Sequence, residues 1–316
     1  MRKQYVFGPI ISRRLGISLG VDLVLPKTCS LDCIYCEARK TTELTCLRRE
    51  YVPLDAVKAE LSDVLADSPE LDYITFSGAG EPTLHSRIGE LAEWLKSNYP
   101  QYRVCLLTNG TLLNDPDVLE SLRYMDLVVP NFDASNAEEL AVINRPAPGI
   151  TVESLAAGIR QAAAIYPGKL VLELFIVPGV NDSPESISRF AGYIQTFAGI
   201  RQVQLNTLDR PGVVDWIKPA DAAVIKRFIA ALEPIVPVEA VGRVRYRSAS
   251  LRKDFQAAGL DENILDLVRS RPLTAQDLAA ALDCSVNEAQ EHAEKLVGLG
   301  ALGAEKQERG MFYFPV

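Results

Sequence analysis

The sequence predicts an α/β protein in which a large domain built on a parallel sheet precedes a small C-terminal domain. Short apolar runs alternate with amphipathic stretches from about residue 20 to residue 232, a rhythm typical of parallel strands joined by helical crossovers. The 316 residues are more than one modest domain needs. From about residue 261 the pattern changes to short helical stretches and one final apolar run.

The strand candidates are apolar runs rich in Val, Ile, Leu and Tyr, at residues 21–25, 73–76, 103–107, 127–129, 170–176 and 203–205. The helix candidates lie between them, at residues 54–65, 88–99, 116–124, 152–165, 184–197 and 220–232. Pro219 indicates that the last of these helices begins at Ala220. This alternation is compatible with an open doubly wound sheet or with a barrel.

The C-terminal segment has its own helix signals. The expected elements are helices at residues 264–268, 275–282 and 286–299 and a strand at residues 311–314. Thr274 and Ser285 are the expected N-caps of the second and third helices. Three helices followed by a strand predict a winged helix-turn-helix domain. We therefore expect a barrel or sheet domain at residues 1–240, a linker at 241–260 and the small domain at 261–316.

Composition and charge argue against several classes of protein. Hydrophobic residues make up 48% and charged residues 23%, which is ordinary for a globular protein with a sizeable core. No apolar run approaches the length of a membrane span, and no apolar segment follows the basic N-terminus, so we expect a cytoplasmic protein without a membrane partner. The net charge of −8 argues against a general nucleic-acid binder, although residues 1–50 carry nine Lys/Arg against five Asp/Glu.

Three cysteines follow the first predicted strand, as Cys29-x3-Cys33-x2-Cys36. Soft thiolate ligands suit iron in a sulfide-bridged cluster. A four-iron cube has four ligand positions and this motif fills three, which leaves one iron open to an external ligand. The alternative is a zinc site completed by His85 or His292, although zinc motifs usually pair C-x2-C units. We expect Cys46 to be an incidental thiol, and Cys105, which lies in a strand, to be buried.

Small, polar or acidic residues follow every predicted strand, at residues 26–29, 77–81, 108–110, 130–133, 178–182 and 206–210. Parallel barrels build their sites at this end of their strands. The segment Gly78-Ala-Gly-Glu81-Pro82 is the most specific of these. Its glycines allow close approach of backbone to a small ligand, and the Glu81 carboxylate can accept a cation.

Through these two motifs the chain resembles the radical S-adenosylmethionine (SAM) superfamily. A longer likeness, in Ile143-Asn-Arg-Pro146, Pro178-Gly-Val-Asn-Asp-Ser183 and Gln204-Leu-Asn-Thr-Leu-Asp-Arg-Pro211, resembles bacterial and archaeal iron–sulfur oxidoreductases grouped with the wyosine-forming tRNA enzyme. The resemblance implies a partial (β/α)6 barrel with SAM across its top and a [4Fe–4S] cluster on the three cysteines.

The same resemblance implies an enzyme that cleaves SAM reductively to a 5′-deoxyadenosyl radical, which abstracts hydrogen from a substrate not yet identified. Tyr35 in the cysteine motif would contact the cofactor, and Gly78, Gly80 and Glu81 would meet the amino group of SAM. From their strand-end positions alone, Asn131 and Asp133 are expected at the ribose or carboxylate and Asn206 near the adenine. The sequence names no catalytic acid, base or radical residue.

Two further functions stay open. One is a tRNA-modifying radical SAM enzyme; the wyosine-forming enzymes, however, carry extra cysteines upstream, and this chain has none before Cys29. The other is a metal-dependent regulator that does not turn SAM over.

Charge suggests two kinds of partner. Arg13, Arg14, Lys27, Arg39, Lys40, Arg48 and Arg49 flank the cysteine motif, which favours an acidic electron donor such as flavodoxin or ferredoxin over an anionic substrate. Residues 261–316 hold ten Asp/Glu and five Lys/Arg, and the candidate recognition helix carries Glu288, Glu291 and Glu294. DNA would repel such a helix, so we expect a protein or peptide partner there.

Overall fold

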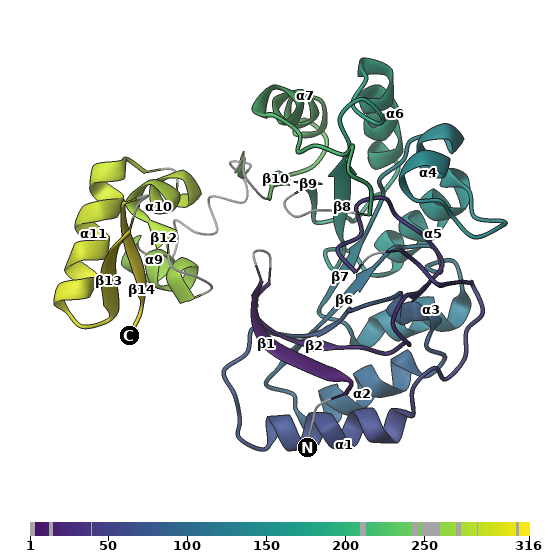
Figure 1. Cartoon of the computed structure of the whole chain (residues 1–316), viewed down its shortest axis with the longest axis horizontal. Helices are drawn as coiled ribbons and strands as arrows, with labels where there is room; N and C mark the ends of the chain where they lie inside the picture. Colours follow the sequence, from purple (N-terminus) through teal and green to yellow (C-terminus); the bar gives the residue numbers. More distant parts are fainter. Residues whose placement is uncertain are drawn as a thin grey trace.

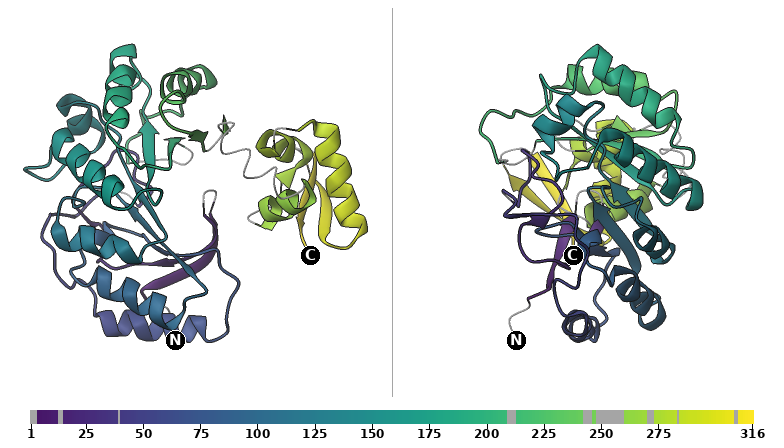
Figure 2. Two further views of the ribbon diagram at one scale, coloured as in Figure 1. Left: turned by 180° about the vertical axis from the view of Figure 1, so that it is seen from behind. Right: turned by 90° about the vertical axis from the view of Figure 1, so that its right-hand side faces the viewer.

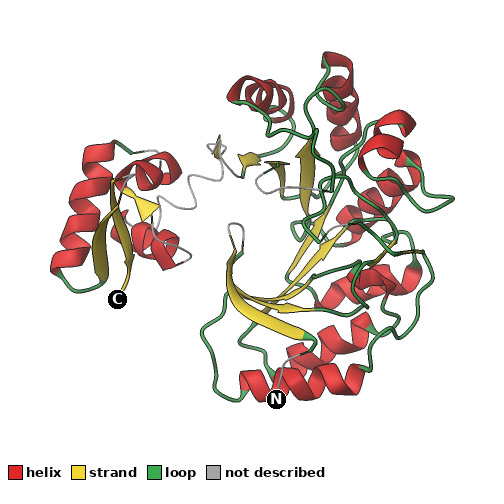
Figure 3. Ribbon diagram, in the orientation of Figure 1, coloured by secondary structure: helices red, strands yellow, loops and turns green. Residues whose placement is uncertain are grey.

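The computed structural model describes residues 4–12, 15–38, 40–208, 213–241, 246–247, 260–269, 273–282, 284–307 and 310–316. Its larger part is a curved sheet with helices along the outer side of the curve (Figure 1). Figure 3 shows the same layering, with strands inside and helices outside. The described residues contain no helix that is both long enough and apolar enough to cross a membrane.

Six parallel strands form the central sheet, which confirms the α/β prediction. They are β2 (Gly16–Val21), β5 (Tyr73–Phe76), β6 (Arg103–Thr108), β7 (Leu127–Pro130), β8 (Val171–Ile176) and β9 (Gln202–Thr207). Single bridges from Val128 to Leu170 and from Asn131 to Glu173 join β7 to β8. Three further strands extend the edges: antiparallel β1 (Val6–Ser12), parallel β10 (Val238–Ala240) and antiparallel β11 (Tyr246–Arg247).

Each parallel connection from β2 to β10 passes through at least one helix on the outer side of the sheet, as Figure 2 shows from two further directions. The helices are α1 (Leu54–Leu65), α2 (Ile88–Asn98), α3 (Pro116–Ser121), α4 (Ala137–Ile143), α5 (Val152–Ile165), α6 (Pro184–Gln195) and α7 (Ala222–Leu232). Two 3₁₀ turns, η1 (Pro82–Leu84) and η2 (Leu122–Tyr124), adjoin them. Several of the helices are capped by a side chain that accepts a backbone N–H group, as Thr151 does for α5 and Ser183 for α6.

The two faces of the sheet differ in chemistry because side chains alternate along a strand. One set of alternate residues, such as Leu172, Leu174, Val203 and Leu205, lies in the main hydrophobic core with the helices. The other set faces the inside of the curve. There, β5 to β7 and the start of β8 contribute a small apolar cluster, whereas most of the inner residues on β8, β9 and β10 are polar.

Several predicted boundaries were wrong. The first strand runs over Gly16–Val21 and not over residues 21–25, because the buried Leu23 and Val24 lie in the loop that follows. An apolar run marks burial, and here it continues past the end of the hydrogen-bonded ladder. Helix α7 begins at Ala222 rather than at Ala220, since the Asp221 carboxylate accepts the N–H of Val224 at 2.8 Å and caps the helix there.

The C-terminal elements have a hydrophobic core of their own. They are α9 (Leu260–Arg269), β12 (Leu273–Thr274), α10 (Ala275–Leu282), α11 (Val286–Gly298), β13 (Leu302–Gln307) and β14 (Gly310–Pro315), with the strands in the order β12-β14-β13. Ser285 caps α11 as predicted, in a capping box with Glu288. Within the predicted linker, the strand 246–247 pairs with β10, while residues 242–245 and 248–259 lie outside the described residues. The winged-helix identity and the domain limits stay predictions.

Candidate cofactor site

The cysteine loop begins on a two-residue strand and then has little regular structure. Cys29 ends β3 (Thr28–Cys29), which pairs in parallel with β4 (Glu43–Leu44). Two backbone bonds tie the next turn to the end of α4, from the N–H of Asp32 to the carbonyl of Asn144 at 2.8 Å and from Ile34 to Ile143 at 2.9 Å. The loop is therefore held in place mainly by its neighbours.

The three cysteines of the motif are partly buried and lie close enough to influence one another electrostatically. Burial, with a smaller contribution from the charge of Glu81, raises the pKa of Cys29 to about 12. Burial also raises the pKa of Cys33 well above its usual value, and the nearby charges of Asp133, Cys29 and Cys36 add to that rise. Thiolates crowded in this way would need a positive partner, which the iron of a bound cluster would supply.

Each of the three sulfurs also accepts a hydrogen bond from a side chain. The amide nitrogen of Asn109 lies 3.4 Å from the Cys29 sulfur, and that of Asn144 lies 3.3 Å from the Cys33 sulfur. The ammonium of Lys27 lies 3.5 Å from the Cys36 sulfur. Sequence reasoning missed all three donors. Asn109 lies in the segment 108–110 that follows a predicted strand, and Asn144 lies in the segment Ile143-Asn-Arg-Pro146. The residues next to them in the sequence give no sign that either side chain would reach a cysteine sulfur.

Asp133, which follows β7, ties the cysteine loop to the sheet. Its carboxylate accepts the hydroxyl of Tyr35 at 2.5 Å, the amide of Asn144 at 2.9 Å and the backbone N–H of Phe175 at 2.9 Å. The ring of Tyr35 stacks on that of Phe175 with centroids 3.8 Å apart. Burial and the neighbouring acidic groups raise the pKa of Tyr35 well above its usual value, so the hydroxyl keeps its proton. Asp133 and Tyr35 therefore position the loop.

Glu81 ties the glycine segment to the end of β6. Its buried carboxylate accepts four hydrogen bonds, from the N–H and hydroxyl of Thr83 at 3.0 and 2.6 Å, the hydroxyl of Thr108 at 2.7 Å and the N–H of Asn109 at 2.7 Å. Burial nevertheless raises its pKa. With its oxygens engaged in this way, the groups that the segment can offer to an ammonium are chiefly backbone carbonyls.

The two glycines of that segment are required by close packing. A Cβ on Gly80 would lie 2.2 Å from the carbonyl oxygen of Thr28, and one on Gly78, at φ +125°, would lie 1.7 Å from a carboxylate oxygen of Asp22. The backbone of Lys27 donates to the carbonyl of Ala79 at 2.8 Å. The glycine segment therefore packs directly against the chain that leads into Cys29, which brings the two sequence motifs together as predicted.

A polar region on the inner face of the sheet lies next to Asp133. The amide nitrogens of Asn131 and Asn206 lie 3.3 and 3.4 Å from one carboxylate oxygen of the buried Glu173. Asn131 also reaches Asp133 at 3.4 Å. The predicted residues Asn131, Asp133 and Asn206 therefore do gather in one place. Sequence reasoning missed Glu173, because an acidic residue inside an apolar run gives no sign of which face it occupies.

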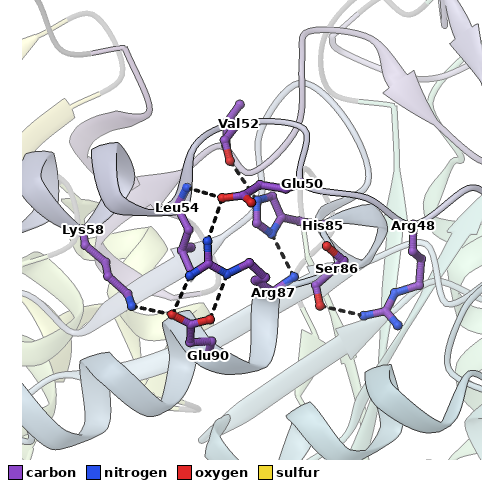
Figure 4. Close-up of polar contacts among 9 residues, drawn as sticks. All are labelled: Arg48, Glu50, Val52, Leu54, Lys58, His85, Ser86, Arg87 and Glu90. Atoms are coloured by element: carbon purple, nitrogen blue, oxygen red, sulfur yellow. Dashed lines mark hydrogen bonds and ion pairs between the residues drawn. The ribbon is translucent and has the colours of Figure 1, made fainter.

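Both histidines are engaged away from the cysteines, which removes the main argument for zinc. The buried His85 donates from Nε2 to the carbonyl of Val52 at 3.0 Å and accepts the N–H of Arg87 at Nδ1, as Figure 4 shows. His292 lies in the C-terminal segment against Asp261. Among the described residues, no three His, Cys, Asp or Glu side chains are spaced to hold a single metal ion. Thiolates on a cluster bind separate irons and lie further apart.

The basic residues after the motif are mostly paired within the chain. Arg48 binds Asp115 at 2.9 Å and donates to the carbonyls of Thr83 and Ser86. Figure 4 shows this arginine beside a network in which Arg87 bridges Glu50 and Glu90. Arg49 pairs with Glu43. Of the other basic residues predicted here, Arg13, Arg14 and Arg39 lie outside the described residues.

Comparisons with known proteins place this geometry in context. A model of the radical SAM superfamily matches residues 23–191, which is more than half of the chain. A UPF0026 protein of Helicobacter pylori is 30% identical over 312 residues, covering 98% of this chain and 96% of that protein. The UPF0026 protein of Methanocaldococcus jannaschii is 28% identical, with 97% and 94% covered.

Two other likenesses show less. The GTPase Obg of Brachyspira hyodysenteriae is 29% identical over 306 residues, which cover 96% of this chain but only 44% of that protein. A solved radical SAM methyltransferase from Sphaerobacter thermophilus superimposes with a TM-score of 0.53 at 16% identity, covering 71% of this chain and 66% of that one. A likeness at this identity shows the fold alone.

Proposed function

Because the chain belongs to the radical SAM superfamily, we propose that Cys29, Cys33 and Cys36 hold its iron–sulfur cluster and that a substrate is activated beside them. The protein is an enzyme whose cofactors are a [4Fe–4S] cluster and SAM. When bound, these cofactors supply a 5′-deoxyadenosyl radical able to abstract hydrogen from carbon. The substrate and the product are open.

The observation that carries the proposal is the chemistry around the three thiols. They lie close together and partly buried, both histidines are engaged elsewhere, and each sulfur accepts a hydrogen bond from an N–H donor. Such donors stabilise the negative charge that a thiolate-ligated cluster carries. Three cysteines and no fourth ligand from a nearby histidine also fit a cluster with one open iron.

The chain's own residues would position SAM and substrate. The segment from Gly78 to Glu81 would offer backbone carbonyls to the SAM ammonium, while Tyr35 and Asp133 hold the cysteine loop in place. The inner face near Asn131, Glu173 and Asn206 would receive the nucleoside and the substrate. Its polar groups are amides and a carboxylate, and the described inward residues of β7, β8 and β9 include no Lys or Arg. This composition favours a ligand with N–H or O–H donors over an anionic one.

An external electron is needed to reduce the cluster. We propose a flavodoxin or ferredoxin as the donor and, since such donors work there, the cytoplasm as the location. We also keep the C-terminal segment as a winged helix that binds a protein or peptide, because the described exposed face of α11 carries Glu288, Glu291 and Glu294.

The test is anaerobic reconstitution with iron and sulfide, followed by reduction with dithionite in the presence of SAM. We expect a brown protein that forms 5′-deoxyadenosine, and Cys33→Ala should abolish both the colour and the product. Cys46→Ala is the matched control, because Cys46 follows the motif in the sequence but does not belong to it. This variant should keep both the brown colour and the formation of 5′-deoxyadenosine. A colourless parent protein that binds zinc through the three thiols would refute the proposal.

A further inference from the structure

Each cysteine of the motif has its own N–H donor, and the three donors come from different parts of the chain. Lys27 precedes the loop, Asn109 follows β6 and Asn144 is the C-cap of α4. Asn109 is 80 residues from Cys29, and Asn144 is 111 residues from Cys33. Lys27 is only nine residues from Cys36, so two of the three contacts are long-range in sequence and the third is local. One donor for each sulfur, two of them from distant elements, is more than loop packing requires.

The orientation of the two amides is fixed by their other partners. The Oδ1 of Asn109 accepts the N–H of Thr111 at 3.0 Å and its hydroxyl at 2.8 Å, so the NH2 group must face the Cys29 sulfur. Its NH2 also donates to the hydroxyl oxygen of Ser30 at 2.8 Å. For Asn144, the carboxylate of Asp133 can only accept, so its amide likewise turns an NH2 group toward the Cys33 sulfur.

Reduction adds one negative charge to a thiolate-ligated cluster. A hydrogen bond or a positive charge at the sulfur stabilises the reduced form more than the oxidised form, which raises the reduction potential. The external reductant loses one electron and the cluster gains it. A change in the reduction potential of the cluster therefore appears as a change in the equilibrium constant of this electron transfer. Neutral amides act through their dipole, whereas the Lys27 ammonium also contributes a full charge.

We infer that Asn109, Asn144 and Lys27 are positioning residues that raise the reduction potential of the cluster by donating to Cys29, Cys33 and Cys36, one residue to each sulfur. The inference rests on the proposed function, because it requires the cluster to be on these cysteines. It adds three residues that act through the ligands and assigns them a measurable electronic effect.

The experiment is a potentiometric titration of the reconstituted protein without SAM, followed by the electron paramagnetic resonance signal of the reduced cluster. Asn144→Leu and Lys27→Met should each make the equilibrium constant for reduction three- to tenfold less favourable, and a tenfold change is about 59 mV for one electron. Lys27→Gln, which retains a donor without the charge, should fall between Lys27→Met and the parent.

Asn131→Leu is the matched control. It removes an asparagine that also donates to Asp133 but reaches no sulfur, so a purely structural effect would change both asparagine variants alike. Iron and sulfide content must equal that of the parent in every variant compared. Should Asn144→Leu fail to load, Lys27→Met and Asn109→Ala decide the question by the same titration.

The inference is overturned if loaded variants keep the parent potential, or if Asn131→Leu shifts it as much as Asn144→Leu does. In that case SAM cleavage by the parent would leave the proposed function intact. A parent chain that loads no cluster would instead overturn the proposed function, and this inference with it.

Discussion

Replacing Gly80 with alanine tests whether the glycine segment and the cysteine loop depend on each other. The new Cβ would lie 2.2 Å from the Thr28 carbonyl oxygen and 2.5 Å from a methyl group of Val24. Gly80 does not have a positive φ, so the substitution introduces a steric conflict without backbone strain. Because Thr28 directly precedes Cys29, relief of the conflict must move the first cysteine or the carbonyls of the glycine segment.

The size of the effect follows from the contacts at stake. Overpacking of this kind costs about 1–3 kcal/mol. Separating the two segments also weakens the bonds from Lys27 N–H to the Ala79 carbonyl and from Glu81 N–H to the Thr28 carbonyl, each worth about 0.5–1.5 kcal/mol. The total of about 2–6 kcal/mol corresponds to a fall in Tm of about 4–24 °C for a domain of this size.

The assay is thermal unfolding of the cluster-free protein by circular dichroism, with iron content measured separately after reconstitution. Gly192→Ala is the control, since Gly192 lies exposed in α6 with nothing within 4 Å of its Cβ position, and it should gain up to about 1 kcal/mol from helix propensity. If Gly80→Ala melts within about 2 °C of the parent and loads the same iron, the packing argument is wrong.

Three other predictions follow from single contacts. Burial raises the pKa of Asp22, so folding favours its protonated form. The stability that this group contributes is full below the ordinary carboxyl pKa of about 4 and is lost as the pH rises through the pKa of the folded protein. Asp22→Asn should therefore flatten the fall of Tm from about pH 4 upward, and an unchanged pH profile would count against this. Arg87→Gln breaks the ion pairs with Glu50 and Glu90, which are partly exposed, so a small loss of Tm should shrink further in 1 M salt, and a loss that salt leaves unchanged would mean packing instead. Ser285→Ala removes the cap of α11 and should lower the stability of that segment by about 0.5–2 kcal/mol, measured by hydrogen exchange, whereas Ser285→Gly should cost only a few tenths; equal effects would refute the capping argument.

Much of the fold could be predicted because its signals are local. The helix at residues 54–65 and that at 152–165 agree with α1 and α5 to the residue, since apolar spacing and end signals lie within the same stretch. The edge strand β1 was not predicted. Its Gly8 and Pro9 interrupt the apolar run, and the register shifts between Phe7 and Ile10, so the strand is tolerated only at an edge.

The candidate site likewise contains residues that local sequence identifies and residues that it does not. Cys29, Cys33 and Cys36 are recognised by their spacing, because one loop carries all three. Asn109 and Asn144 could not be found, since their roles depend on where β6 and α4 end in space relative to that loop. A single sequence gives the residue types of such partners, but their distances to the sulfurs arise only from the sheet order.

The two buried carboxylates explain how a loop with so little regular structure can hold its three cysteines in place. Glu81 gathers donors from η1 and the end of β6, and Asp133 gathers donors from the cysteine loop, the end of α4 and β8. A carboxylate accepts several hydrogen bonds at once, so one side chain can connect several segments of the chain. Replacing either carboxylate would leave buried donors unsatisfied in several elements. The loss in stability should therefore exceed that from breaking any single hydrogen bond. The position of the cysteines is thus set by residues outside their motif, and variants of Glu81 or Asp133 should lose cluster content even though no ligand has changed.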